Sequence, residues 1–393
     1  MDHWDHRGVC EFCAMVSGAL MVCGGAVVDC IVRPFDSEQR GASRTSMPGE
    51  ARISQGGVGR NMAEVSLRLG CPVRLLSAVG ADEPGRQLLN HCQQLGIIVE
   101  DVAVLQGART ATYTALLDGS GELVGAVADM AILDNIPPEV LVQRCSSLED
   151  VKLVLCEANL NAQALKAALE TSRGKQTVEV WFDPVSVAKA SRGVAGVAKS
   201  PWQLAAPNWD ELLAMLGKSQ RPLQWQNDEL PADLVEAAAE ALVPGFGFAE
   251  KLLLSLGSKG CVLARQLPDA PDAQTSNAIV RKVEIDVAGL VEQCSAHPNL
   301  VVQLEERRQN GCSLLWYRLL RPLDHVQDVT GAGDALLAGT ASAFVAGWDL
   351  QDAIFVGLVA AHLTLFVAGS ICDQLRPEIL QRLQQQLHIQ SRL

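Results

Sequence analysis

The sequence lacks the features that define several large classes of protein. Its 32 basic and 45 acidic side chains give a net charge of −13, whereas binding to a DNA or RNA backbone needs clustered Lys and Arg. No run approaches the roughly 20 apolar residues of a membrane-spanning helix, and no loop of the form Gly-x-x-x-x-Gly-Lys-Ser/Thr occurs. We therefore expect a small-molecule substrate, with neither a nucleic acid polymer nor a membrane as partner.

The 12 cysteines do not follow the regular spacing of a secreted disulfide framework. Most lie within apolar runs, so we expect reduced thiols and an intracellular protein. The apolar stretch 12–28 could suggest a signal peptide, but acidic residues precede it and it runs into Gly24, Gly25 and Asp29. We interpret it as a first β-strand.

Both ends of the chain carry short patterns outside the expected domain, which covers 19–380 between tails at 1–18 and 381–393. Ser391-Arg392-Leu393 is close to the Ser-Lys-Leu peroxisomal address. It predicts a peroxisomal protein, or a cytoplasmic one if these residues are only a frayed tail. The cluster His3-x-x-His6-x-x-x-Cys10-x-x-Cys13 has zinc-ligand spacing, but without a second Cys-x-x-Cys pair a cysteine-bearing tail is preferred.

The chain is long and 48% apolar, so it can form a large core. Short β-prone runs alternate with helical segments such as 61–69, where Met62, Val65 and Leu69 recur at helical spacing before Gly70. This alternation predicts a mostly parallel sheet with helices on both faces, and ligands bind beyond the carboxyl ends of such strands. The predicted strands are 20–28, 73–79, 151–156, 178–182 and 252–256.

Two regions interrupt this alternation. Within 110–130, two β-prone runs flank the glycine-rich turn Asp118-Gly-Ser-Gly121. The pattern predicts either a hairpin that projects from the sheet as a lid or a plain edge hairpin. The segment 266–322 is polar and contains several prolines, so we expect an excursion on the late strands that is partly loop.

The run Asp328-Val-Thr-Gly-Ala-Gly-Asp334 precedes a stretch of small residues that predicts a helix ending at Gly347. Small residues let the backbone approach a ligand closely, and the free N–H groups of a helix N-terminus bind anions. Gly331 to Gly333 are therefore a candidate phosphate site. Asp334 could accept a proton from a hydroxyl group beside it, or it could only interact favourably with the helix dipole.

A second glycine-rich turn, Gln55-Gly-Gly-Val-Gly-Arg-Asn61, opens the predicted helix that runs to Leu69. Gly56 and Gly57 let the main chain lie against a ligand, and the Asn61 amide can donate to and accept from a diol. Asp29, at the end of the first predicted strand, is a further candidate for binding sugar hydroxyls.

Two shorter motifs suit a nucleotide, although each also fits an ordinary turn. Asn208 and Glu211, in Pro207-Asn-Trp-Asp-Glu211, could hold the water shell of a Mg²⁺ ion that bridges phosphates. Ser255 and Gly257, in Leu254-Ser-Leu-Gly-Ser-Lys-Gly260, could contact phosphate or ribose.

In this order, the motifs resemble the ribokinase-like (PfkB) carbohydrate kinase family, whose signatures are Gly-Gly-x-Gly-x-Asn and Asp-Thr-x-Gly-Ala-Gly-Asp. Here they read Gly56-Gly-Val-Gly-Arg-Asn61 and Asp328-Val-Thr-Gly-Ala-Gly-Asp334, and the resemblance covers roughly 21–368. It implies a three-layer α/β/α sandwich with a small β-lid formed near 29–53 and 110–130. It also implies ATP with Mg²⁺, phosphorylation of a sugar or nucleoside hydroxyl, and a homodimer through the lid.

The resemblance implies a role for each motif residue. Asp334 would be the base, and Gly331, Ala332 and Gly333 would form the anion hole. Asp29, Gly56, Gly57 and Asn61 would bind the sugar; Thr330, Gly331, Gly333, Asn208, Glu211, Ser255 and Gly257 would bind ATP; Glu211 would hold Mg²⁺ through water; Asp328 and Thr330 would lie near a K⁺ ion.

Several strings resemble one group within the family, the pseudouridine kinases. Such an enzyme would transfer phosphate from ATP to the 5′-hydroxyl of the nucleoside, with Thr112 and Tyr113 of the lid covering the base. The same machinery would serve adenosine, inosine or ribose, although Val58 stands where ribokinases have a lysine. A member that binds nucleotide without turnover is a third interpretation, which the presence of Asp334 disfavours. The strings are 56–64, 111–118, 128–130 and 181–189.

Two histidines are not expected to act as bases. His362 lies in an apolar helical stretch, which predicts a core residue or a wall of the adenine pocket. His325 precedes the Asp334 motif and is expected at the surface.

Overall fold

The computed structural model describes residues 19–35, 46, 48–119, 122–147, 150–174, 178–195, 197, 200–226, 229–267, 276–291, 299–321, 326–367 and 369–391. The N-terminal His/Cys cluster, His325, Arg392 and Leu393 lie outside these ranges, so the zinc and peroxisome expectations stay predictions. Within these ranges, none of the helices has both the length and the apolar character needed to cross a membrane.

The core of the fold is an 11-stranded mixed sheet in the order β13-β14-β15-β12-β11-β10-β9-β8-β1-β4-β5. Strands from β5 to β11 in this order pair in parallel, and the remaining strands are antiparallel. Central strands are continuous apolar runs because both of their faces are covered. The strands are β1 (Ala19–Cys23), β4 (Val73–Gly80), β5 (Val102–Leu105), β8 (Val151–Glu157), β9 (Glu179–Asp183), β10 (Leu204–Ala205), β11 (Lys251–Ser255), β12 (Cys261–Gln266), β13 (Ser276–Ile285), β14 (Leu300–Gln309) and β15 (Cys312–Leu319).

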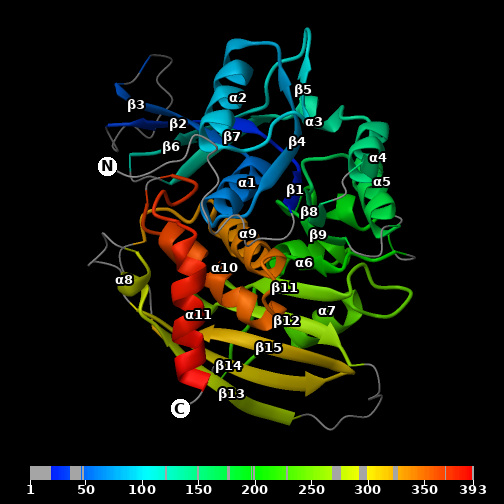
Figure 1. Ribbon diagram of the computed structural model, residues 1–393, viewed down its shortest axis with the longest axis vertical. Helices are drawn as coiled ribbons and strands as arrows, with labels where there is room; N and C mark the ends of the chain where they lie inside the picture. Colours follow the sequence, from blue (N-terminus) through cyan, green and yellow to red (C-terminus); the bar gives the residue numbers. More distant parts are fainter. Residues whose placement is uncertain are drawn as a thin grey trace.

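Helices pack on both faces of this sheet and form two apolar clusters, one on each face. This arrangement confirms the predicted three-layer α/β/α sandwich (Figure 1). One face carries α1 (Val58–Arg68), α2 (Glu83–Leu95), α8 (Val287–Leu290), α9 (Ala332–Val345), α10 (Leu350–Thr364) and α11 (Glu378–Ser391). The other face carries α3 (Ala131–Asp134), α4 (Pro138–Ser147), α5 (Ala162–Arg173), α6 (Trp209–Met215) and α7 (Ala232–Ala241).

A separate four-stranded sheet, which we call the lid sheet, has the order β3-β2-β6-β7. Its strands are β2 (Val27–Pro34), β3 (Gly49–Gly56), β6 (Thr112–Leu117) and β7 (Leu123–Asp129). Two antiparallel hairpins meet where β2 and β6 pair in parallel, so the 110–130 hairpin belongs to this sheet and not to an edge of the large one. The lid sheet lies at the upper left of Figure 1.

Strand pairing gives the lid sheet two different faces, because successive side chains of a strand point to opposite sides. Asp29 is paired with Ser54 and Tyr113, which places these three residues on one face. The opposite face leaves Ile53 and Val127 largely exposed. A homodimer through this apolar face stays a prediction.

The second half of the chain extends the fold beyond the parallel strands. Within 266–322, expected as an excursion on the late strands that is partly loop, β13, β14 and β15 extend the large sheet by three antiparallel strands. Residues 381–391 are not a tail but the main part of α11. Leu380, Leu383 and Leu387 recur at helical spacing and are buried in the core, which anchors this helix.

Candidate active site

The glycine-rich turn of residues 55–61 connects β3 of the lid sheet to α1. Gly57 precedes the helix with a φ of 94°, and a Cβ atom there would lie 2.5 Å from the carbonyl oxygen of Gly25. A Cβ atom on Gly59 would lie 2.8 Å from the carbonyl carbon of Gly24. Glycine is required here because α1 begins directly against the chain that leaves β1. This close approach places Asn61 in the interior of the site.

The motif from Asp328 to Asp334 leads into α9, on the opposite side of the site from the first turn of α1. Gly331 has a φ of 79°, and a side chain there would collide with the carbonyl oxygen of Ser370. Asp334 lies in the first turn of α9 and is 9% exposed. Its Oδ2 accepts a hydrogen bond of 2.8 Å from Nδ2 of Asn61, although the two residues are 273 positions apart. The structure therefore brings the two predicted motifs into direct contact.

Burial changes the acidity of the two carboxyl groups on this side of the site. It raises the pKa of Asp334 to about 7, although the Asn61 hydrogen bond and the charge of Arg60 act to lower it. Burial also raises the pKa of Asp29 to about 6, and Arg60 again lowers it. A carboxyl group whose pKa lies near neutrality is well matched to accept a proton from a substrate hydroxyl.

The lid sheet contributes Asp29 and Tyr113 to the site from the face that these residues share. The Asp29 carboxylate lies against Gly56, where a Cβ atom would overlap it. Thr112 points to the opposite face of β6 with Val28, so the structure does not bring Thr112 together with Tyr113. This separation follows from the alternation of side chains along a strand.

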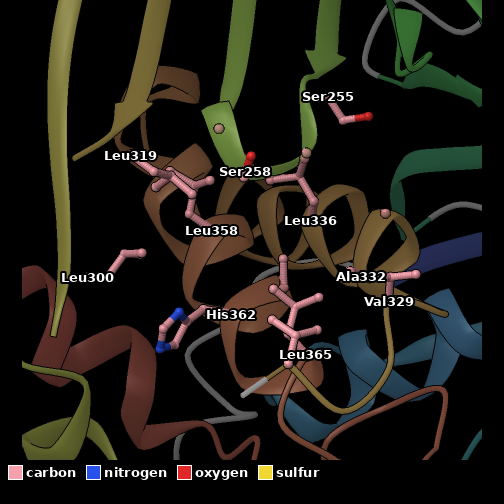
Figure 2. Close-up of a pocket in the computed structure, with 15 residues that line it drawn as sticks. Ser255, Ser258, Leu300, Leu319, Val329, Ala332, Leu336, Leu358, His362 and Leu365 are labelled. Atoms are coloured by element: carbon pink, nitrogen blue, oxygen red, sulfur yellow. The ribbon is translucent and has the colours of Figure 1, made fainter. Parts of the chain in front are cut away.

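A cavity of about 350 Å³ extends from the beginning of α9 between the sheet and α10 (Figure 2). Ser255, Gly257 and Gly333, which were predicted to contact nucleotide, line it together with Ala332, which was predicted for the anion hole, whereas most of the wall is aliphatic. His362 forms part of this wall and is buried, with its ring 5.1 Å from that of Phe366 and edge-on to it. The aliphatic wall residues are Leu300, Leu319, Val326, Val329, Leu336, Leu358, Ala361 and Leu365.

Thr330 and Asp328 do not belong to this wall. They form an exposed turn before α9, in which Oδ1 of Asp328 accepts a hydrogen bond of 2.8 Å from the Thr330 amide. The K⁺ role of these residues stays a prediction, and a direct contact from Thr330 to nucleotide is not supported by the cavity.

A smaller cavity of about 120 Å³ contains Asp334 and adjoins the larger one at Gly333 and Ser255. Asn208 and Glu211 line it and cap α6 reciprocally, each side chain accepting from the other's backbone N–H at 2.9 Å. Asp183, at the end of β9, lies in the same cavity. Burial raises its pKa well above the usual value, and the charges of Asp334 and Glu211 raise it further.

This group of carboxylates suits a divalent cation, which would relieve the repulsion among them. In the part of the chain that the structure describes, no three acidic, His or Cys side chains converge as a metal-ligand set. The role of Glu211 in holding Mg²⁺ through water therefore stays a prediction.

Asp183 and Glu157 belong to the site but were given no role from the sequence. Each lies at the carboxyl end of a parallel strand, which is the general signal that could have identified it. Glu157 is fully buried and accepts hydrogen bonds from the backbone N–H groups of Gly25 and Asn159. Next to Asp183, Val185 has a φ of 64°, a strained conformation for a β-branched residue.

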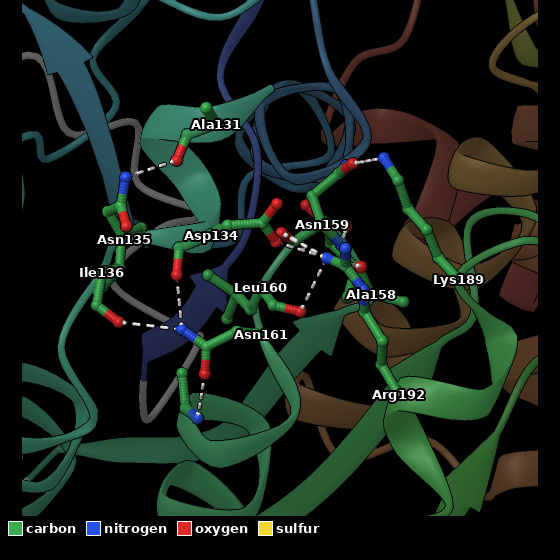
Figure 3. Close-up of polar contacts among 12 residues, drawn as sticks. Ala131, Asp134, Asn135, Ile136, Ala158, Asn159, Leu160, Asn161, Lys189 and Arg192 are labelled. Carbon is green, nitrogen blue, oxygen red and sulfur yellow. Dashed lines mark hydrogen bonds and ion pairs between the residues drawn. The ribbon is translucent and has the colours of Figure 1, made fainter. Parts of the chain in front are cut away.

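The loop after β8 is held by a polar network (Figure 3). Nζ of Lys189 donates to Oδ1 of Asn159, and Arg192 pairs with Asp134 at 2.7 Å while donating to carbonyl oxygens of the loop. Asn161 caps α5 and donates to the carbonyl oxygens of Asp134 and Ile136. These contacts fix the loop that carries Asn159 beside Gly25.

Comparison with known proteins identifies the family. The model of the pfkB family carbohydrate kinases matches residues 19–285 and 317–378. The chain belongs to this family. It is therefore a phosphotransferase of the sugar and nucleoside kinase type, and the unmatched residues 286–316 include β14, part of the sheet extension.

Two relatives are similar in sequence. The chain is 26% identical to the pseudouridine kinase of Arabidopsis thaliana over 349 residues, which cover 87% of this chain and 89% of that protein. It is 37% identical to the pseudouridine kinase of Escherichia coli (strain K12) over 144 residues, or 37% of this chain and 45% of the relative.

Solved structures agree with the fold. A ribokinase from Cryptococcus neoformans in complex with ADP superposes with a TM-score of 0.64 at 18% identity, covering 94% of this chain and 99% of that one. A ribokinase from Arabidopsis thaliana complexed with ribose and ATP gives a TM-score of 0.61 at 17% identity, with coverage of 93% and 98%.

Proposed function

We propose that this protein phosphorylates the 5′-hydroxyl group of pseudouridine, using ATP and producing pseudouridine 5′-phosphate and ADP. The observation that carries the proposal is the hydrogen bond between Asn61 and Asp334. It joins the sugar-side turn to the beginning of α9, so a candidate base lies between the lid sheet and the nucleotide cavity. The choice of nucleoside is supported by the two relatives that are pseudouridine kinases.

Asp334 would accept the proton of the 5′-hydroxyl as that oxygen attacks the transferred phosphoryl group. Its pKa of about 7 lets it be ionised at neutral pH and still bind a proton during the reaction. The backbone N–H groups at the beginning of α9 lie next to it and would stabilise negative charge that develops on the phosphoryl oxygens. Bound ATP and Mg²⁺ would supply the phosphoryl group and neutralise part of its charge.

Asp29 and Asn61 would bind the ribose, because their carboxylate and amide groups can accept from and donate to neighbouring hydroxyls. Tyr113 shares a lid face with Asp29 and would cover the nucleoside. The aliphatic cavity at the other side of α9 would hold the adenine ring of ATP, with His362 in its wall.

A panel of acceptors tests the assignment. The protein would be incubated with ATP, Mg²⁺ and each of pseudouridine, uridine, adenosine, inosine and ribose, and ADP release and the phosphorylated product would be measured. We expect pseudouridine to have the highest kcat/KM. A higher value for ribose or adenosine would contradict the proposed substrate while leaving the kinase family intact, and no turnover with any acceptor would contradict the enzyme assignment.

A further inference from the structure

Arg60 occupies an unfavourable position for an arginine. It lies in the first turn of α1, where the helix dipole opposes a positive charge, and only 3% of it is exposed. Its Nε is buried with no hydrogen-bond partner among the described residues. A buried charge with an unused donor is costly, so stability alone is a weak explanation for this residue.

The side chain is held by ion pairs that leave a net positive charge. Nη1 of Arg60 lies 2.6 Å from Oε2 of Glu64, and the other oxygen of Glu64 lies 2.6 Å from the guanidinium group of Arg68. One buried carboxylate is therefore shared by two arginines. The three side chains together carry one positive charge along one side of α1.

Arg60 also begins a hydrogen-bonded chain that ends at Asp334. Nη2 of Arg60 donates to Oδ1 of Asn61 at 2.8 Å, and Nδ2 of Asn61 donates to Oδ2 of Asp334 at 2.8 Å. An arginine can only donate hydrogen bonds, so the amide oxygen of Asn61 must face Arg60. The amide N–H group must then face Asp334. Without Arg60, the bond to Asp334 would be the one side-chain hydrogen bond within the described ranges that holds the amide in this orientation.

The charge of Arg60 acts in the same direction as this geometry. It lowers the pKa of both Asp29 and Asp334, against the larger effect of burial. Asp29 and Glu157 act on Asp334 in the opposite sense, and Asp183 and Glu211 lie in the cavity beside it. Within this acidic surrounding, Arg60 favours the ionised form of the candidate base.

We propose that Arg60 is a positioning residue for phosphoryl transfer, which fixes the Asn61 amide so that it holds the Asp334 carboxylate in one orientation. The inference rests on the proposed role of Asp334 as base. It predicts that loss of Arg60 affects the chemical step much more than binding of ATP, and that the effect requires Asn61.

A mutant cycle tests this prediction. All variants are made in the wild-type background, because Arg68 still pairs with Glu64 at 2.6 Å after the arginine is removed, so no unpaired carboxylate is left buried. Arg60→Met, Asn61→Ala and their combination are compared in single-turnover reactions, using the acceptor that the wild-type protein phosphorylates best. Arg74→Met is the matched control, because Arg74 also pairs with a buried carboxylate, Asp101 at 2.8 Å, away from the site.

We expect Arg60→Met to slow the single turnover by about 10- to 100-fold with less than a threefold change in KM for ATP. In a protein that already carries Asn61→Ala, adding Arg60→Met should slow the single turnover by less than about threefold further. Equal losses in both backgrounds, or an Arg60→Met rate within twofold of its parent, would overturn the proposal. Arg74→Met should lower thermal stability but leave the rate within twofold.

Two further variants keep the test decisive. If Arg60→Met does not fold, Arg60→Lys in the wild-type background replaces it, because lysine retains the pair with Glu64. Arg60→Lys should slow the single turnover by about three- to tenfold, and this smaller loss should again require Asn61. Equal losses with and without Asn61 would again overturn the proposal.

Asp334→Asn is measured in parallel. A near-normal rate in that variant would contradict the proposed base, whereas an Arg60 effect independent of Asn61 would contradict this inference alone.

Discussion

The two sides of Asp334 are built from different kinds of residue. On the lid side, its neighbours are polar: the buried Asn61 donates to its carboxylate, and the charges of Arg60 and Asp29 affect its pKa. On the nucleotide side, the larger cavity is lined mostly by Leu, Val, Ala and Gly. Hydrogen bonds fix orientation and reject wrong partners strongly, whereas apolar contacts discriminate weakly. We therefore expect selectivity for the acceptor to exceed selectivity for the nucleotide base.

A large effect should come from the glycines between the two sides. Gly331→Ala would strain a positive φ and push the chain away from Ser370, so we expect a loss of about 1–3 kcal/mol in the free energy of unfolding together with loss of activity. A Cβ atom on Gly333 meets nothing within 4 Å, so Gly333→Ala should fold normally. Its methyl group would occupy the phosphate space and slow turnover by about 100-fold or more.

Thermal denaturation and steady-state kinetics on the two glycine variants separate these effects. A destabilised Gly333→Ala variant would mean that this glycine serves the fold, and a fully active one would remove the phosphate site from the beginning of α9.

The pH dependence reports on the lid side. Asp334 must be deprotonated to accept a proton, and burial raises its pKa to about 7. Activity should therefore be full above this pKa and fall about tenfold per pH unit well below it. The measurement is the pH profile of kcat/KM with a saturating concentration of ATP. A rate that stays constant down to pH 5 would contradict a base with a raised pKa.

Asp29 should affect the acceptor and spare the nucleotide. Asp29→Asn removes the charged acceptor that would bind a sugar hydroxyl, so we expect the KM for the nucleoside to rise about tenfold. The KM for ATP should change by less than twofold, because Asp29 belongs to the lid sheet. Steady-state kinetics with each substrate varied in turn checks the difference, and equal changes in both values would break the separation between the two sides.

The smallest effect should come from the aliphatic wall. Leu365 points into the larger cavity (Figure 2), and Leu365→Ala removes apolar contact without removing a hydrogen bond. We expect the KM for ATP to rise about two- to fivefold, with the KM for the nucleoside unchanged. The Kd for ADP, measured by calorimetry, gives an independent check. A change confined to nucleoside binding would place the adenine elsewhere.

The sequence predicted those parts of the fold that depend on local patterns. Runs of apolar residues indicated the central strands, and the glycine turns before α1 and α9 identified the two motifs that meet at Asn61 and Asp334. The strands β13 to β15 were less visible, because the run of consecutive charged residues from Glu305 to Arg308 interrupts the alternation of apolar and polar residues in β14. The end of α11 was missed although Leu383 and Leu387 carried the helical spacing.

The parts of the site that escaped prediction depend on contacts between distant segments. The ends of their strands marked Glu157 and Asp183 only as general candidates, because the contact of Glu157 with Gly25 and the shared cavity of Asp183, Asp334 and Glu211 form only in the folded chain. Thr112 and Tyr113 were assigned together because they are adjacent in sequence, whereas pairing with β2 places them on opposite faces. Arg60 belongs to the glycine-rich motif before α1, but its hydrogen bond to Asn61 appears only in three dimensions.

Asp334→Asn tests the central claim most directly, because the amide preserves the size of the side chain and removes its ability to accept a proton. Binding of ATP would be measured by calorimetry and phosphorylation of pseudouridine by single turnover. We predict that ATP affinity stays within about threefold while the rate falls by about 1,000-fold or more. A rate within tenfold of the wild-type value, with normal ATP binding, would contradict Asp334 as the base.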